Sequence, residues 1–396
     1  MLDGLRTLDC SDRLGWLAGR MLADLGAEVV KIEPPDAGLG AADWQAYNAN
    51  KRLLRLDPGQ PRERAALAEL LLHADVLIET AAPGSPLAEL LRPDELRARN
   101  PRLIQVSIRP FGADGPRAQW QASDLELMAA GGAMSLAGEP DGAPTRISAP
   151  QAGLWAGAQA AVGALIALAH RGATGAGQQV AVSAQAAVLT ALAHAPTFYD
   201  LLGEVPTRCG EYITGRTLTG ARMRAFWTCR DGYINFVLYG GVAGHRSNQQ
   251  LASWMREAGV PLGVVAEIDW TAFDPKPLTQ AQVEELEQPI LRFFAGLTKR
   301  EFLEGAAARE MLGYPVSTVE DIASDPQLEA RGFWDDVQSA TGERVRHCGG
   351  FAMVDRARVP LRYAPGQAVD FEALLVEFGG AGVRRPVAMA EPMVAR

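Results

Sequence analysis

The sequence predicts an α/β protein with two parts: a large domain with a Rossmann-like open parallel sheet, and a smaller α/β domain. Short apolar segments alternate with helical segments through the first half of the chain. This alternation is typical of a mostly parallel sheet with helices on both faces. Near Pro206 the pattern changes to a hairpin-like segment followed by helices, which indicates a second domain.

The predicted strands of the large domain share a short run rich in apolar residues. They cover residues 5–9, 28–32, 53–56, 75–78 and 103–108. Predicted helices lie between or beside them, at residues 14–25, 61–73 and 93–99. Gly26 directly follows the first of these helices and is a typical C-terminal stop.

A nearly all-apolar helix is predicted at residues 156–169. It stops at His170 and Arg171, before reaching the ~18 apolar residues that a bilayer span needs. We therefore predict a buried core helix and no membrane partner. A glycine-rich turn, a strand and a further helix follow; they cover residues 172–177, 178–183 and 184–202.

The second domain is predicted to open with a hairpin at residues 225–237, with Asp231 and Gly232 as the turn. Its predicted helices cover residues 248–258, 279–297 and 299–309. The predicted division is a large domain at residues 1–205 and 329–396, and a small domain at residues 206–328.

Composition excludes several classes of protein. The net charge of -9 argues against a nucleic-acid partner. The N-terminal residues lack the basic region and apolar run of a signal peptide. The four cysteines show no CxxC spacing, so we expect neither a metal site nor a disulfide framework, and we expect a reducing, cytoplasmic setting.

Several blocks of the chain resemble the family III CoA-transferases, the group that includes formyl-CoA and carnitine CoA-transferases. The central block is RISAPQAGLWAGAQAAVGALIALAHRGATGAGQQV at residues 146–180. Further blocks occur in the same order as in the family: LADLGAEVVKIEPP (22–35), NANKRLLRLD (48–57), RARNPRLIQVSIRPFGADGP (97–116), LAGEPDGAPTRI (136–147) and GYPVSTVEDIASDPQLEARGFW (313–334). The resemblance covers nearly the whole chain.

The resemblance implies a large domain built from both chain ends, with a small domain inserted between them. It also implies an interlocked dimer, in which two ring-like subunits thread through each other. Members of the family move CoA between carboxylic acids. Their aspartate attacks an acyl-CoA, forming a mixed anhydride and then an aspartyl-CoA thioester, so the nucleophile must be a carboxylate.

Gly153 stands where the resemblance places that aspartate, four residues before Gly157. No Asp or Glu occurs from residue 145 to residue 180, so we assign no catalytic residue. The racemase branch of the family uses a histidine and an aspartate; those positions are Ser123 and Gly153 here, and neither side chain can perform acid–base work. Asp124 matches a family residue that resembles a structural hydrogen-bond acceptor.

The family's CoA contacts are also altered. Cationic and aromatic residues of the family are replaced at Thr80-Ala81-Ala82, Pro58-Gly59, Ala88 and Trp120-Gln121. Charge-assisted hydrogen bonds to phosphate supply much of the affinity for a nucleotide, so coenzyme A or acyl-CoA is expected to bind weakly or not at all. The candidates that remain for CoA binding are Arg13, Leu14, Lys51, Arg52 and Arg109.

Three hypotheses for function follow. The chain is the non-catalytic subunit of a CoA-transferase, paired with a homologous subunit that bears the aspartate. Alternatively, it is an active transferase or racemase-like enzyme that uses a non-standard residue. In the third hypothesis it is a homodimeric scaffold or binding protein for another small ligand.

Overall fold

The computed structural model describes residues 1–213, 220–338 and 344–379, and these residues form two compact units. Unit 1 comprises Met1–Ala133, Arg146–Val205 and the described residues from Pro326 onward; unit 2 comprises Met134–Thr145 and the described residues between Pro206 and Asp325. The sequence predicts boundaries after residues 205 and 328, and it leaves residues 134–145 in the large domain. The structure returns to unit 1 at Pro326 and assigns Met134–Thr145 to unit 2.

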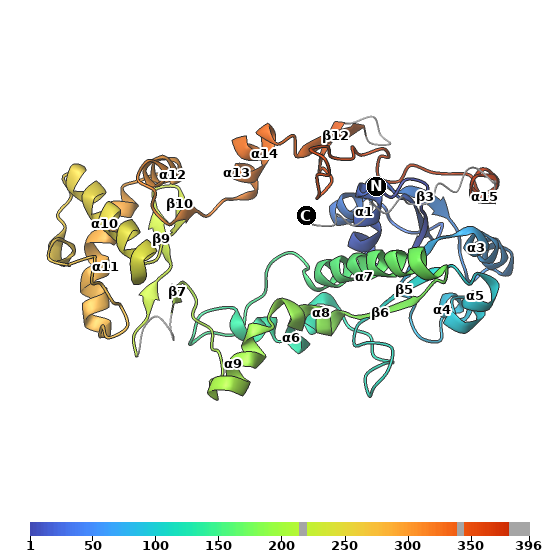
Figure 1. Ribbon diagram of the computed structural model, residues 1–396, viewed down its shortest axis with the longest axis horizontal. Helices are drawn as coiled ribbons and strands as arrows, with labels where there is room; N and C mark the ends of the chain where they lie inside the picture. Colours follow the sequence, from blue (N-terminus) through green and yellow to red (C-terminus); the bar gives the residue numbers. More distant parts are fainter. Residues whose placement is uncertain (214–219, 339–343, 380–396) are drawn as a thin grey trace, which may run out of the picture. The chain divides into compact units, whose positions relative to one another are not determined.

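Unit 1 is built on a six-stranded parallel sheet with the order β3-β2-β1-β4-β5-β6 (Figure 1). The strands are β1 (Arg6–Cys10), β2 (Glu28–Glu33), β3 (Arg52–Arg55), β4 (Val76–Glu79), β5 (Ile104–Arg109) and β6 (Gln179–Ser183). This is the order of a Rossmann sheet, and it confirms the predicted α/β fold. The order reverses between β1 and β4, and we call the region outside their carboxyl ends, where ligands of such sheets bind, the crevice of unit 1.

Helices cover both faces of this sheet. They are α1 (Trp16–Asp24), α2 (Ala42–Asn48), α3 (Pro61–His73), α4 (Pro86–Leu90), α5 (Pro93–Arg99), α6 (Asp124–Ala130), α7 (Ala152–Thr174), α8 (Ala184–Ala191) and α9 (His194–Leu202). The single helix predicted at residues 184–202 is two helices, with Leu192 at the C-terminal cap of α8.

The C-terminal part of the chain returns to unit 1 and covers the β3 edge of the sheet. Leu53 N donates to Gln367 O at 2.7 Å, and Val369 N donates to Leu53 O at 2.9 Å. Helix α15 (Phe371–Gly379) then packs against α3 through Leu374 and Phe378. The short helix α14 (Pro326–Ala330) and the antiparallel strands β12 (Trp334–Gln338) and β13 (Arg344–Cys348) belong to the same return. Unit 1 is therefore built from residues that precede unit 2 in the sequence and from residues that follow it.

Helix α7 is longer and less covered than the sequence predicts. It extends beyond residues 156–169 at both ends, and one side packs against α1, β5, β6 and α8. On the other side Val162 and Ile166 are 52% and 64% exposed. Among the helices in the described part of the chain, α7 alone is long and apolar enough to cross a membrane, by length and composition only. Of its most apolar 18-residue segment, 39% is buried. The predicted core helix is therefore buried on one side and exposed on the other.

Unit 2 combines a small antiparallel sheet with helices. Strands β9 (Phe226–Cys229), β10 (Gly232–Asn235) and β11 (Tyr314–Pro315) form the sheet, and β7 (Tyr212–Ile213) pairs with β8 (Met223–Arg224). The helices are α10 (Gly241–Glu257), α11 (Gln280–Ala295), α12 (Lys299–Ala308) and α13 (Val319–Ala323). Its core is aromatic: Phe294 makes edge-to-face contacts with Trp227 and Phe236, at centroid distances of 5.5 and 5.7 Å.

Two details of unit 2 differ from the prediction. The hairpin turn lies at Arg230 and Asp231, one residue earlier than predicted, because Gly232 already pairs with Cys229. Helix α10 begins at Gly241 rather than near Asn248. Residues 241–247, which the sequence analysis leaves outside any predicted helix, are therefore the first turns of α10.

Candidate functional site

The crevice of unit 1 lies between the loops that follow β1 and β4, where ligands of open α/β sheets bind. Asp12 N donates to Thr80 Oγ1 at 2.8 Å and joins these two loops. Leu14 N donates to Asp12 Oδ1 at 3.0 Å and shapes the turn that leads into α1. Thr80, the first residue of the altered Thr80-Ala81-Ala82 segment, therefore stands at the point where the strand order reverses.

Gly153 lies in the first turn of α7 and packs against the loop after β1. A Cβ atom at Gly153 would lie 2.5 Å from the carbonyl oxygen of Arg13 and 3.4 Å from Leu14 Cα. At Gly157, one turn further along, a Cβ atom would lie 3.0 Å from Leu17 Cβ. The two glycines allow α7 to approach α1 closely. A side chain at residue 153 does not fit unless the backbone moves.

Buried polar groups fix the position of this loop. Lys31 Nζ donates to Ser11 O at 2.6 Å, and Ser11 Oγ donates to Asp9 Oδ1 at 2.5 Å. Ser11, Lys31 and Asp9 are all buried. Both interactions are buried and each includes a charged group, so moving the loop away from Gly153 would break charge-assisted hydrogen bonds in the interior.

Asp124 caps the start of α7. Its Oδ1 atom accepts hydrogen bonds from the backbone N–H groups of Gln151 and Ala152, both at 2.7 Å. The predicted acceptor role is confirmed. Ser123 caps α6 in a capping box with Glu126. The carboxylate of Asp124 therefore occupies the positive end of α7, beside the position where the family's nucleophile is expected.

Lys51, one of the predicted CoA contacts, is fully buried beneath α1. Its Nζ donates to Asp9 Oδ2 at 2.7 Å, Asn48 Oδ1 at 2.8 Å and Trp16 O at 2.8 Å. Burial lowers the pKa of Lys51 to about 8, although Asp9 opposes this effect. For Asp9, burial acts to raise the pKa, but Lys51 and Lys31 together lower it below the ordinary value. All three ammonium hydrogens of Lys51 are used inside the protein.

The other predicted cations are also paired with carboxylates of this chain. Arg13 meets Asp43 at 2.6 Å, and Arg109 meets the buried Glu79 at 2.9 Å. Arg52 lies between two carboxylates, Glu28 and Glu377, both at 2.8 Å. The structure brings Arg13 and Leu14 to Gly153, and it places Arg109 at the same edge of the sheet. CoA binding by these five residues stays a prediction.

The acidic partners are the residues that the sequence reasoning missed. Glu79 and Arg109 are the last residues of two neighbouring parallel strands, so the order of the strands could have revealed this pair. Asp43 pairs with Arg13, and Asp9 pairs with Lys51. These pairs do not lie at the ends of two neighbouring strands, so the order of the strands does not reveal them.

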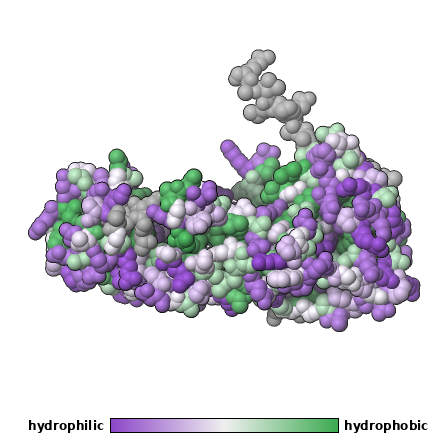
Figure 2. Space-filling view, turned by 90° about the horizontal axis from the view of Figure 1, so that it is seen from below, coloured by the Kyte–Doolittle hydropathy of each residue, from purple (hydrophilic) through white to green (hydrophobic). Residues whose placement is uncertain are grey.

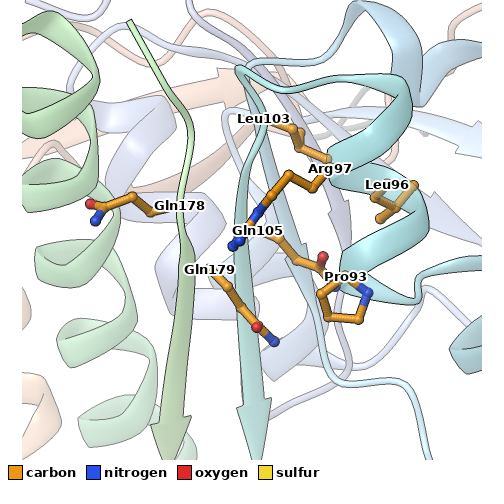
Figure 3. A pocket seen from close by; sticks show the side chains of 7 residues that line it. All are labelled: Pro93, Leu96, Arg97, Leu103, Gln105, Gln178 and Gln179. Atoms are coloured by element: carbon orange, nitrogen blue, oxygen red, sulfur yellow. The ribbon is translucent and has the colours of Figure 1, made fainter. Parts of the chain in front are cut away.

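Two cavities of unit 1 lie away from the crevice. Figure 3 shows a cavity of about 10 Å³ into which Arg97 of α5 reaches toward β5 and β6. An adjoining hollow of about 410 Å³ is lined by His170, Gly177 and neighbouring residues. His170 lies about 25 Å along α7 from Gly153, at a rise of ~1.5 Å per residue. Neither space belongs to the crevice. In the described part of the chain, no group of three or more His, Cys, Asp or Glu is placed to hold a metal ion.

The sheet order and the crevice define an open α/β protein of the Rossmann type, with a second unit inserted in the chain. The family model for CoA-transferase family III matches residues 2–368, so the chain belongs to this family.

Two relatives are similar to this chain over most of their length. The chain is 31% identical over 353 residues to the succinyl-CoA:(R)-benzylsuccinate CoA-transferase subunit BbsE of Thauera aromatica, covering 83% of this chain and 82% of that protein. It is 28% identical over 381 residues to a succinate–glutarate CoA-transferase of Agrobacterium fabrum, covering 91% of each. Among solved structures, a CAIB/BAIF family protein from Brucella suis matches with a TM-score of 0.79 and 26% identity, over 95% of this chain and 99% of that one.

Proposed function

We propose that this chain is the non-catalytic subunit of a hetero-oligomeric CoA-transferase. A homologous subunit supplies the aspartate, and the pair transfers CoA from an acyl-CoA to a carboxylic acid. The observation that carries this proposal is the contact between Gly153 and the Arg13 carbonyl. At this position the chain has neither a nucleophilic side chain nor the space for one.

The proposed chemistry takes place on the partner subunit. The partner's carboxylate attacks the thioester carbonyl, the C–S bond breaks, and CoA thiolate leaves as a mixed anhydride forms. The thiolate then attacks the aspartyl carbonyl and releases the first acid, leaving an aspartyl-CoA thioester. A second carboxylate repeats these steps in reverse order, and the aspartate is regenerated.

The charges of the predicted CoA-binding residues also support a non-catalytic role. Arg13, Lys51, Arg52 and Arg109 each face a carboxylate of this chain, as described above. An anionic ligand would have to displace these carboxylates or leave them close to its own phosphates. Coenzyme A therefore binds weakly or not at all at this site in our proposal.

The exposed apolar surface of unit 1 supports a partner of the same family. Val162 and Ile166 of α7 are exposed. Leu201, Leu202 and Val205, in and just after α9, are exposed as well. Figure 2 shows apolar surface on the side of the molecule that faces downward in Figure 1. In the proposed interlocked dimer, the second chain covers these residues. The relative from Thauera aromatica is itself named as a subunit.

Co-expression with a homologous chain that bears the aspartate tests the proposal. The mixed complex is expected to transfer CoA, and this chain alone is not. A fully active homo-oligomer of this chain would overturn the proposal and would favour the hypothesis of an active enzyme with a non-standard residue.

A further inference from the structure

The hollow lined by His170 and Gly177 lies at the amino edge of the sheet of unit 1. It adjoins the starts of two neighbouring strands, β5 at Ile104 and β6 at Gln179. Its volume of about 410 Å³ falls within the range of roughly 300–1,000 Å³ that is typical of small-molecule sites. The crevice lies at the opposite, carboxyl edge of the same sheet, so the hollow is a separate space.

The walls of the hollow are held together by hydrogen bonds and close packing. Gly177 N donates to Pro101 O at 2.8 Å, and a Cβ atom at residue 177 would overlap the carbonyl oxygen of Leu103. Arg102 Nη1 donates to Gly175 O at 2.8 Å. These contacts join the segment before β5 to the segment before β6, so the hollow is formed by the fold itself.

The lining of the hollow is rich in hydrogen-bond donors. Arg97, His170, Gln178 and Gln179 supply nitrogen atoms, and none of the described residues that line the hollow is acidic. Within the described part of the chain, none of these four side chains forms a hydrogen bond or an ion pair. Figure 3 shows Arg97, Gln178 and Gln179 around the small cavity that shares these three residues with the hollow. In a chain with a net charge of -9, this lining is a local group of donors with a cation that has no partner.

The end of α7 beside the hollow carries less negative charge than a bare helix end. The last carbonyl groups of a helix are unsatisfied and partly negative, and they repel an anion. Here Thr174 Oγ1 donates to His170 O at 3.0 Å, and Gly175 N donates to Arg171 O at 2.8 Å. Arg102 binds the carbonyl of Gly175, as described above. These donors offset the negative end of the helix, so the hollow suits an anionic group.

We propose that this hollow binds the phosphate group of a small molecule. The guanidinium of Arg97 pairs with the phosphate oxygens, and His170 and Gln179 donate further hydrogen bonds to them. Two sources share this chemistry, inorganic phosphate and a small phosphate ester, whose organic part the hollow also has the volume to hold. The site does not depend on the proposed non-catalytic role, because its binding can be measured without any transfer reaction.

The ring C–H signals of His170 in the proton spectrum of the isolated full chain report on the site. Their assignment follows from the signals that are lost in His170→Gln, while the remaining histidine signals show that the fold is intact. The titrants are inorganic phosphate, glycerol 3-phosphate, glycerol and chloride, all at one fixed pH. Glycerol keeps the organic part without the phosphate, and chloride keeps a negative charge without the phosphate oxygens.

We expect a saturable shift of the His170 signals with inorganic phosphate, with glycerol 3-phosphate, or with both. The ligand that binds more tightly identifies the source. Arg97→Gln is expected to weaken binding ~10-fold. Arg99→Gln changes an exposed arginine of the same helix that does not line the hollow, and it leaves binding unchanged. No saturable shift with either phosphate, or an equal response to chloride or glycerol, would overturn the proposal. Equal weakening by the two arginine variants would overturn it as well.

Discussion

The carbonyl oxygen of Arg13 lies 2.5 Å from the point where a side chain at Gly153 would begin. Real Cβ atoms do not approach an oxygen so closely, so the space that a nucleophile would need is filled by backbone. The loop that fills it is anchored by the buried ammonium of Lys31 on Ser11. At residue 153 the chain therefore has neither a carboxylate nor open space for a side chain.

Alanine substitutions at two glycines of α7 should have opposite effects on stability. Gly153→Ala forces a methyl group against the Arg13 carbonyl and is expected to lower the free energy of unfolding by ~1–3 kcal/mol. Gly172 has open space around its Cβ position, so Gly172→Ala should raise stability by ~0.5–1 kcal/mol through helix propensity. Urea unfolding of both variants checks this. A neutral or stabilising Gly153→Ala would show that the packing at Gly153 is looser than described.

Restoring the carboxylate alone should not restore chemistry. Gly153→Asp meets the same backbone oxygen as Gly153→Ala and adds a charge beside the carboxylate of Asp124 at the start of α7. We expect no CoA transfer by the isolated Gly153→Asp chain in an assay that uses succinyl-CoA as the donor. Detectable turnover by this variant would mean that the crevice retains a working arrangement.

Breaking the buried ion pair under α1 should destabilise unit 1 strongly. Lys51→Met leaves the buried Asp9 carboxylate without its closest cation, at an expected cost of ~3–5 kcal/mol. Arg13→Met removes an exposed pair with Asp43 and should cost less than ~1 kcal/mol. The free energies of unfolding of the two variants check the contrast. Similar free energies of unfolding for the two variants would contradict a structural role for Lys51. Ligand binding would then be the explanation for a lysine at this position.

The strands of unit 1 were predictable because buried parallel strands are short and apolar. The predicted strands at residues 5–9 and 103–108 lie within one residue of β1 and β5. The true length of α7 was not predictable. Its first turn contains Gly153, a residue type that disfavours a helix, and the packing against Arg13 and Leu14 that leaves room only for a glycine is a tertiary contact. The pairing of Arg109 with Glu79 likewise depends on strand order, which residue types alone do not reveal.

Acid should weaken unit 2 through Asp321. A hydrogen bond from Lys299, with further bonds from Thr318, holds the pKa of Asp321 at about 2, below the ordinary 3.8. Because the folded-state pKa is depressed, this stabilisation is complete above about pH 4 and is lost as the pH falls toward 2. Asp321→Asn should therefore unfold at a lower temperature than the wild type at pH 7, and the difference should shrink toward pH 2.5. A difference that does not depend on pH would contradict the assignment.

A charge on the exposed side of α7 should prevent association without unfolding the chain. Ile166→Glu lies on the uncovered side of the helix, so its free energy of unfolding should change by less than ~0.5 kcal/mol. Its mass in sedimentation analysis should fall to that of one chain. Val376→Glu, at a 74% exposed apolar residue of α15, is the matched control and should leave the assembly intact. An Ile166→Glu chain that assembles like the wild type would place the interface elsewhere.

The location of the covalent intermediate tests the central claim most directly. The co-purified complex of this chain with a homologous aspartate-bearing subunit is incubated with succinyl-CoA, and the intact mass of each chain is measured. The account predicts that the mass of CoA appears on the partner subunit alone and disappears when the partner's aspartate is changed to alanine. A CoA adduct on this chain, in the complex or in isolation, would contradict the account.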